Sequence, residues 1–492
     1  MNYKIVSKLL SMIFAILAGA ILLSLGVSFI YRAEALEQSA MSGWLISLIS
    51  ALVISFAFYL PSRNAQMKLF KREAFCIIAL GWLATSLFGA LPFMLIVDAH
   101  YADAIFESTS GFSTTGASAF ASVVDFPKSL LFWRALSQWI GGLGVVVFFV
   151  AILSFLGAGA RILYSYESSA NSSEHDTGKI KNGIAKIFYL YISISVLCFI
   201  TYYLCGLDCF QAFCYMLTTV PSGGFALYET YMSEFNSPAL EWAMIVFMFI
   251  AGLSFIFMLS LIKGNFTYVK KNTEFWTYLL MCLIAALILA LPMIDFSNMS
   301  FANLHNSYRS TLFEVLSIVT TTGYSVGDYT LWEPMTQILL FILMCTGACA
   351  GSTSGGLKLS RVITSIKLTF MQIEKSYRPK VIRPLMINGK ALDDDSSNQV
   401  LGFVVLYALL FFIGIFLISI FESDMSFAGA ISSVISSLSN VGPALAEVGP
   451  SHSYSFMTDA SKILLAFLMI LGRIEIYAIL ALFVPSFWRT FR

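Results

Sequence analysis

Long uncharged apolar windows recur along the whole chain. A helix needs about 20 apolar residues to cross the roughly 30 Å hydrocarbon core of a bilayer. Nine windows of this kind occur at residues 9–31, 44–62, 74–97, 135–160, 187–207, 242–262, 275–294, 334–357 and 400–421. A tenth window, 463–486, is interrupted by Arg473 and Glu475. The pattern predicts an all-α polytopic membrane protein with ten spans, and the first window is interpreted as a helix rather than a cleaved leader.

Four polar segments between these windows resemble one another. They run from Ala104 to Ala117, Ala212 to Phe225, Thr311 to Tyr324 and Ala430 to Pro443. Each begins with a helix-compatible half, continues into hydroxyl or amide side chains, and reaches a glycine twelve positions on: Gly116, Gly224, Gly323 and Gly442. Glycine adopts backbone conformations that other residues avoid, so consecutive carbonyls after a short helix can turn toward one axis. Four such segments predict a closed ring.

The order of windows and polar segments predicts a repeated plan of span, pore loop and span. Residues 1–66 form an extra amino-terminal helix pair, because no polar segment lies between its spans. The four pore repeats are 67–165, 166–268, 269–372 and 373–492. Each unit begins and ends on the same side, so the copies are expected to be parallel around an axis along the membrane normal. Non-helical backbone at membrane depth must be buried or line a cavity, which favours a central pore.

Composition and charge agree with a membrane location and predict an orientation. The chain of 492 residues is 58% hydrophobic and only 12% charged, far from the composition of soluble domains. If the amino terminus is cytoplasmic, 23 of the 29 Lys and Arg residues fall on the cytoplasmic side, as the positive-inside rule requires. Both termini are therefore expected to be cytoplasmic, and the four polar segments open to the outside.

Two basic linkers lie on the predicted cytoplasmic side, around Arg161 to Lys186 and Lys375 to Lys390. Neither is long enough for an independent domain, so a regulatory domain must come from another chain. Their charge is explained either by the positive-inside rule alone or by a docking surface for such a partner.

Cysteine and histidine usage argues against catalytic chemistry. The eight cysteines lie in or beside apolar windows and are interpreted as buried thiols, although a bond among Cys205, Cys209 and Cys214 is left open. The four histidines are far apart in loops, so the chain offers no catalytic cluster and is not expected to be an enzyme. A non-transporting scaffold would not require four ring segments.

Several motifs together resemble a known family. Besides the four loops, the chain contains QWIGGLGVVV at 138–147, GACAGSTSGGLK at 347–358, NVGP at 440–443 and GRIE at 472–475. The set resembles the Trk/Ktr/HKT superfamily of potassium transporters, and the extra helix pair is most similar to the membrane subunits of bacterial Trk uptake systems. The match covers nearly the whole chain. One departure is Ala444, where the family usually has a second glycine after NVGP.

The resemblance implies potassium uptake through a selectivity filter of backbone carbonyls, with potassium as the bound ion. The candidate filter residues are Thr114, Thr115, Gly116, Ser222, Gly223, Gly224, Thr321, Thr322, Gly323, Asn440, Val441 and Gly442. In plant relatives, Ser in place of the first filter glycine accompanies sodium transport, so Gly116 favours potassium. The alternative is a sodium-permeable, or sodium- or proton-coupled, cation transporter of the same fold, and whether flux is passive or coupled as symport stays open.

Two carboxylates occupy matching positions nine residues before their filter glycines, Glu107 and Glu314. They are interpreted mainly as structural support that pairs with loop amides behind the filter. The alternative is that they add negative potential at the mouth.

Two features are expected to obstruct the path below the filter. The run 347–356 is too rich in Gly, Ser and Thr to continue a straight helix. It resembles the family's intramembrane gate, with Gly347, Gly351, Gly355 and Gly356 as its flexible points. A phosphate-binding loop is disfavoured because a Leu separates Gly356 from Lys358.

Arg473 is the second predicted obstruction. It lies in the middle of the apolar run 463–483, where a charge requires water or a partner. If that run is one helix, Glu475 points to a different side and is expected to meet another span. Arg473 is predicted either to project into the pore as an electrostatic barrier or to form a buried structural pair.

The resemblance also implies an assembly. It predicts a homodimer in the bacterial inner membrane, each chain with its own pore, bound on the cytoplasmic face to a ring of nucleotide-binding regulatory subunits. The nucleotide that such subunits sense does not follow from this sequence.

Overall fold

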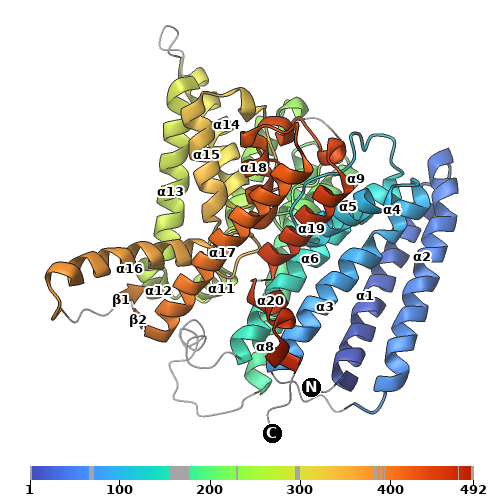
Figure 1. The fold of residues 1–492 in the computed structure, drawn as a ribbon. Helices are drawn as coiled ribbons and strands as arrows, with labels where there is room; N and C mark the ends of the chain where they lie inside the picture. Colours follow the sequence, from blue (N-terminus) through green and yellow to red (C-terminus); the bar gives the residue numbers. More distant parts are fainter. Residues whose placement is uncertain are drawn as a thin grey trace.

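A computed structural model describes residues 3–65, 71–155, 177–228, 231–293, 300–381, 385–387, 390–392, 394–474 and 476–488. The linker that begins at Arg161, Glu475 and the last four residues lie outside the described residues. The chain is mostly helical, with long helices running roughly side by side and short helices between them (Figure 1).

The helices follow the predicted order. The first two are α1 (Tyr3–Ile30) and α2 (Ala35–Tyr59). The predicted first repeat contains α3 (Lys71–Gly89), α4 (Leu91–Ile96), α5 (Tyr101–Phe112) and α6 (Lys128–Phe155). The second contains α8 (Thr177–Leu204), α9 (Cys209–Thr219), α10 (Pro238–Ala251), α11 (Phe255–Ile262) and α12 (Phe266–Lys271). The third contains α13 (Thr273–Ala290), α14 (Phe301–Val319), α15 (Pro334–Thr346) and α16 (Leu359–Tyr377). The fourth contains α17 (Asp394–Phe421), α18 (Phe427–Ser439), α19 (Asp459–Arg473), α20 (Tyr477–Phe483) and α21 (Pro485–Trp488). Short 3-10 turns cover Leu60–Ser62, Met232–Phe235, Leu291–Met293, Tyr329–Leu331, Ala446–Val448 and Tyr454–Phe456.

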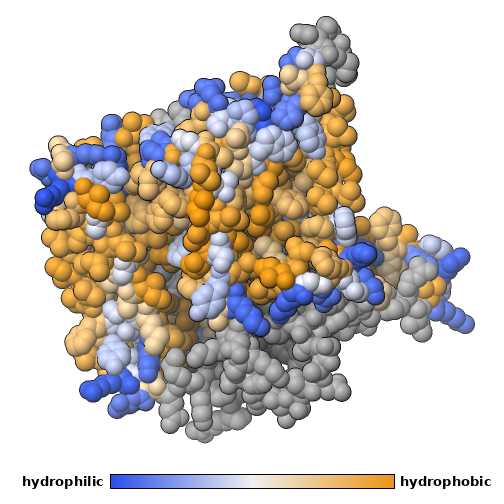
Figure 2. All heavy atoms as spheres, turned by 180° about the vertical axis from the view of Figure 1, so that it is seen from behind, coloured by the Kyte–Doolittle hydropathy of each residue, from blue (hydrophilic) through white to orange (hydrophobic). Residues whose placement is uncertain are grey.

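The outer surface has the hydropathy of a membrane protein. Figure 2 shows a broad apolar band between two polar ends. Large apolar side chains such as Phe56, Leu204 and Phe412 are exposed on the long helices. In a membrane these side chains would contact lipid rather than water. Six described helices are long and apolar enough to cross a membrane, or eight if each of two bent pairs counts as one span. The start of α1 and the short α21 lie at the same end of the molecule (Figure 1).

Three of the predicted spans are not continuous helices. Two of the breaks correct the sequence interpretation, and the third, at Gly347, begins the run predicted to interrupt a helix. Window 242–262 is bent by 101° between α10 and α11, and window 463–486 is bent by 117° between α19 and α20. Window 334–357 is helical only to Thr346, where Gly347 ends α15 with a φ of 67°. The windows 242–262 and 463–486 are apolar on both sides of their breaks, so a composition window cannot detect those two.

Each of the four helices that precede the polar loops, α5, α9, α14 and α18, is packed between two helices of the predicted spans. We call these four the short helices, although α14 has 19 residues. The flanking pairs are α3 and α6, α8 and α10, α13 and α15, and α17 and α19. The second helix of each pair also packs on the short helix of the next repeat: α6 on α9, α10 on α14, α15 on α18, and α19 on α5. Because the last contact returns to the first repeat, the short helices form a closed circle.

Two of the four short helices, α9 and α18, begin at side-chain caps, whereas α5 and α14 have no side-chain cap. Asp208 and Gln211 form a capping box at the start of α9, and the Ser426 hydroxyl accepts from the Gly429 amide at the start of α18. Caps of this kind satisfy the first free amides of a helix. Every residue from Phe106 to Phe112 at the end of α5 is buried. The caps therefore fix where α9 and α18 start, and burial of its last residues fixes the position of α5.

A small β-hairpin departs from the all-α prediction. Strands β1 (Leu385–Ile387) and β2 (Lys390–Leu392) pair antiparallel, with Ile387 opposite Lys390. The sequence between them is Asn388-Gly389, which is the commonest signal for a two-residue hairpin turn.

The eight cysteines are free thiols, five of them buried. The disulfide left open among Cys205, Cys209 and Cys214 does not form. The interpretation as small apolar side chains is confirmed for Cys76, Cys198, Cys214, Cys282 and Cys349.

Candidate functional site

The loops that follow the four short helices share one backbone pattern. In each, a residue with a side chain has a φ of 54–58° and lies two positions before a glycine with a φ of 75–101°. The pairs are Thr114 and Gly116, Ser222 and Gly224, Thr321 and Gly323, and Asn440 and Gly442. Left-handed φ is unfavourable for residues with a Cβ. Its recurrence at four equivalent positions shows that the surrounding packing imposes it.

The four loops form a ring in chain order. A Cβ on each glycine would come closer than 3.0 Å to a carbonyl oxygen of the next loop. These contacts run from Gly116 to Gly223 O, from Gly224 to Thr322 O, from Gly323 to Val441 O, and from Gly442 to Thr115 O. The last contact returns to the first loop, so all twelve candidate filter residues are brought to one place. Only a residue without a Cβ fits at the four glycine positions.

Two of the twelve carbonyls are bound by side chains of the protein. Gln138 Nε2 donates to Gly223 O at 2.7 Å. The Gly442 carbonyl accepts from Ser436 Oγ at 2.7 Å and from Tyr454 Oη at 3.0 Å. A carbonyl oxygen has two lone pairs, so the Gly442 oxygen is fully occupied by protein donors. The carbonyl oxygens of the four loops are therefore not equally free to bind an ion.

Glu107 and Glu314 support the loops from behind, as the structural interpretation predicted. Glu107 accepts from the Ala119 amide at 2.9 Å, and Glu314 accepts from the Val326 amide at 2.7 Å. Both amides lie three residues after the filter glycine, so the two carboxylates do the same work in repeats one and three. Both are fully buried.

The two carboxylates differ in their charged partners. Arg134 lies 2.7 Å from Glu107 in a buried ion pair and also donates to Ala226 O at 3.1 Å. It thereby ties the helix before the first filter loop to the segment after the second. Both carboxylates also accept from the hydroxyl two residues after the filter glycine, Glu107 from Ser118 at 3.1 Å and Glu314 from Ser325 at 2.6 Å. Among the described residues only Glu107 has an arginine partner. Arg134 was assigned no role from the sequence, where it appears only as a basic residue at the edge of a span.

The predicted gate segment lies directly against three filter loops. Thr353 Oγ1 is 3.1 Å from Ser222 Oγ, and the Gly355 amide donates to Thr321 Oγ1 at 2.8 Å. A Cβ on Gly355 would clash with Ser439 O and with Asn440. Gly347, Gly351 and Gly356 all have positive φ, so the segment needs glycine to adopt this path.

Arg473 reaches the same segment. Its guanidinium is buried and Nη1 donates to Thr353 O. Within the described residues its Nε and Nη2 have no hydrogen-bond partner. Arg473 is the last residue of α19 rather than the middle of a continuous span. The expected direction of Glu475 assumed one helix through both residues, so that argument fails.

Glu274 holds the predicted gate segment from the amino-terminal end of α13. Its carboxylate is buried and accepts from the Ala350 amide at 2.6 Å. A hydrogen bond to a carboxylate is roughly twice as strong as a neutral one. Glu274 was assigned no role from the sequence, where it appears only as an acidic residue one position before an apolar window.

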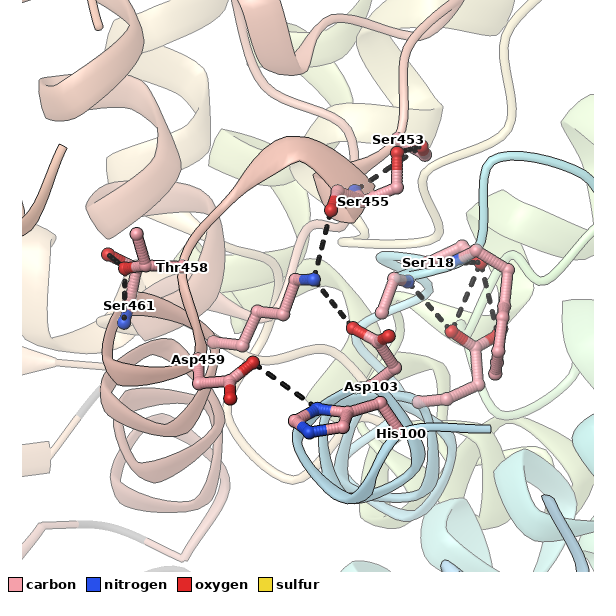
Figure 3. A network of polar contacts seen from close by, with 12 residues as sticks. His100, Asp103, Ser118, Ser453, Ser455, Thr458, Asp459 and Ser461 are labelled. Carbon is pink, nitrogen blue, oxygen red and sulfur yellow. Dashed lines mark hydrogen bonds and ion pairs between the residues drawn. The ribbon is translucent and has the colours of Figure 1, made fainter. Parts of the chain in front are cut away.

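Ion pairs join two of the four boundaries between predicted repeats at the end of the molecule where α10 and α19 begin, which is the outer end in the predicted orientation. Lys462 of α19 binds Asp103 of α5 at 2.6 Å, and Arg309 of α14 binds Glu241 of α10 at 2.8 Å. Figure 3 shows His100 and Asp103 facing the segment that carries Ser455 and Asp459. His100 Nδ1 lies 3.4 Å from Asp459 there. These contacts close the ring between the fourth and first repeats.

Comparison with known proteins assigns this architecture. The profile of the TrkH family, described as cation transport proteins, matches residues 42–490. The chain belongs to the TrkH family. TrkH-family proteins are transporters, and this membership confirms the resemblance and the non-enzymatic class.

Individual TrkH relatives match over most of their length. The chain is 34% identical to the Trk system potassium uptake protein TrkH of Halomonas elongata, over 88% of this chain and 89% of that protein. It is 28% identical to the protein of the same name from Escherichia coli K12, over 99% and 100% of the two chains. The crystal structure of the potassium transporter TrkH from Vibrio parahaemolyticus superimposes with a TM-score of 0.89 at 27% identity, over 99% and 100%.

Proposed function

We propose that this chain takes up potassium ions across the inner membrane of a bacterium. The observation that carries the proposal is the closed ring of four loops, each with a left-handed glycine against a carbonyl of its neighbour. Rings of backbone carbonyls replace the hydration shell of potassium. The relatives that cover the whole chain are named as potassium uptake proteins, which agrees with this ion.

The proposed architecture has ten spans. The six long helices and two bent pairs, together with α6 and α15, make up this number. We divide the chain into the pair 1–66 and four parallel repeats at 67–165, 166–268, 269–372 and 373–492. The circular packing of the short helices supports this division. The predominance of basic residues on one side supports cytoplasmic termini.

The proposed selectivity filter consists of the four loop segments 114–116, 222–224, 321–323 and 440–442. Potassium is favoured over sodium because the first loop has Gly116, and a side chain there would enter the ring and contact Gly223 O. The hydrogen bonds on the Gly223 and Gly442 carbonyls imply that loops one and three supply the freer ligands.

The proposed gate is the segment 347–358 together with Arg473. The segment touches the second, third and fourth filter loops, so a cation leaving the ring would meet it first. The Arg473 guanidinium on Thr353 O adds a positive charge at that point. A buried cation of this kind opposes another cation.

The proposed assembly is a homodimer with cytoplasmic regulatory subunits that bind nucleotides. The name "Trk system" carried by the relatives describes a system of several components. Mass measurement of the membrane-extracted protein should give two copies. A monomer that gates normally without any partner would contradict the assembly.

Growth rescue tests the proposed function. Expression in a potassium-uptake-deficient bacterium should restore growth at low potassium, and rubidium flux should exceed sodium flux in the same cells. Equal or greater sodium flux would favour the alternative, a sodium-permeable or ion-coupled transporter. No rescue by a well-expressed, folded protein would overturn the proposal.

A further inference from the structure

One position breaks the pattern of the four filter loops. The residue before the filter glycine carries a side chain in three loops, as Thr115, Thr322 and Val441, but is Gly223 in the second loop. Thr115 Oγ1 bonds Ser113 Oγ at 2.7 Å, and Thr322 Oγ1 bonds the Thr320 hydroxyl at 2.8 Å. These side chains anchor their own loops. Gly223 has no side chain with which to do so.

The amide of Gln138 occupies the space beside Gly223. A Cβ on Gly223 would come within 3.0 Å of all three polar-end atoms of Gln138. Gln138 Nε2 donates to Gly223 O at 2.7 Å, and the Phe225 amide donates to Gln138 Oε1 at 3.2 Å. One side chain therefore bridges the backbone on both sides of Gly224. The two contacts require opposite ends of the amide, so they also fix its orientation.

Gln138 is also an exception among the residues at the equivalent position of the four helices that pack on the next short helix. It is the eleventh residue of α6, which packs on the second short helix. The eleventh residues of α10, α15 and α19, which pack on α14, α18 and α5, are Met248, Met344 and Met469. All four side chains are fully buried. Methionine thus accompanies a loop residue with a side chain, and glutamine accompanies glycine.

We infer that Gln138 is a positioning residue for ion selectivity, which anchors the second filter loop from the first repeat in place of the side chain that Gly223 lacks. Its Nε2 takes one lone pair of the Gly223 carbonyl and leaves the other for the ring. That hydrogen bond fixes the direction of the carbonyl. The inference rests on the proposed filter and names a determinant of its selectivity outside the four loops.

Replacing Gln138 tests this role. Gln138→Met copies the other three boundaries and removes both hydrogen bonds at similar side-chain length. We expect the rubidium-to-sodium flux ratio to fall about two- to tenfold, the effect of losing an ordinary hydrogen bond. The potassium concentration for half-maximal uptake should rise. Gln399→Met, at an exposed position of α17, is the matched control and should leave both quantities unchanged.

Gln138→Glu gives a second reading if the methionine variant fails to fold. It keeps an oxygen for the Phe225 amide but replaces the donor to Gly223 O with an acceptor, so selectivity should fall again. Thermal unfolding of the purified protein identifies which variants are folded. An unchanged flux ratio in a folded Gln138→Met or Gln138→Glu protein would overturn the inference.

A double substitution tests whether Gln138 and residue 223 share one space. Gly223→Thr alone should lose most transport, because its Cβ collides with Gln138. Combining it with Gln138→Met reproduces the Met248 and Thr322 pair of the next boundary and should recover part of the flux. A double variant no better than Gly223→Thr would count against the inference. Failure of the proposed function is separate, since it would appear as absent potassium uptake in the unsubstituted protein.

Discussion

The outer and inner halves of the candidate pathway are built on different principles. The outer half uses four similar loops, one from each repeat, and every loop repeats the same left-handed backbone positions. The inner half uses one segment from the third repeat and one arginine from the fourth. A repeated element can surround an ion evenly, whereas a single element can move without its copies. The difference indicates that selection and obstruction of the ion are separable.

The filter glycines provide the strongest test of that separation. Substitution by Ser at Gly116, Gly224, Gly323 or Gly442 adds a Cβ at positive φ against a neighbouring carbonyl. We expect potassium over sodium selectivity to fall by at least about tenfold, since left-handed strain alone costs roughly 1–2 kcal/mol. The ratio of rubidium flux to sodium flux in each variant measures this selectivity.

Gly327→Ser is the matched control for the glycine series. No atom lies within 4 Å of its Cβ position, and its φ is not positive. Its selectivity should match the parent protein. Unchanged selectivity in all four filter variants would exclude the ring as the filter.

Removing the charge of Arg473 should affect the inner half alone. We expect Arg473→Ala to raise potassium flux several-fold, because it removes both a buried cation and the anchor on Thr353 O. The rubidium-to-sodium ratio should stay constant. Arg32→Ala, at the outer surface, is the control. Unchanged flux in folded protein, or a changed ion ratio, would contradict the barrier role.

Loosening the gate segment from its other side should have a smaller effect. Glu274→Ala removes the carboxylate that accepts from the Ala350 amide. We expect flux to rise about twofold, less than in Arg473→Ala, and amide exchange in residues 347–358 to become faster. Exchange rates that match the parent protein would show that Glu274 does not hold the segment.

Changing an outer ion pair should alter stability and leave transport least affected. Lys462→Met leaves the Asp103 carboxylate without its 2.6 Å partner, and we expect a loss of up to about 3 kcal/mol in stability. The exposed pair of Lys128 and Glu34 is the control, where Lys128→Met should cost at most about 1 kcal/mol. Thermal unfolding measures both. A larger loss of stability in Lys128→Met than in Lys462→Met would show that burial of the ion pair does not determine its contribution.

The sequence predicted the outer half well because its signals are local. Glycine spacing, hydroxyl-rich ends and flanking apolar windows identified all four loops, and the matching positions of Glu107 and Glu314 predicted their contact with loop amides. Each signal lies within about a dozen residues of the structure that it specifies, and it occurs more than once.

The inner half was harder to predict because its contacts join distant segments. The break after Arg473 divides a uniformly apolar run, so hydropathy favoured one helix, and the direction inferred for Glu475 depended on that helix. Gln138 and Glu274 acquire their roles only when another repeat is placed beside them. Nothing in their immediate sequence distinguishes these roles from an ordinary buried amide or a helix-start carboxylate.

The two outer ion pairs have a consequence for how the repeats find their places. The fourth residue of α10 is Glu241 and the fourth residue of α19 is Lys462, while their partners on the following short helices are Arg309 and Asp103. Where the second repeat meets the third, the acidic residue is on the first of the two helices; where the fourth meets the first, the basic residue is. Exchanging the two neighbours would bring Lys462 against Arg309 and Glu241 against Asp103, and like charges in contact are unfavourable. Pairing in the wrong order is therefore penalised, so pseudo-symmetric repeats on one chain can assemble in a unique circular sequence.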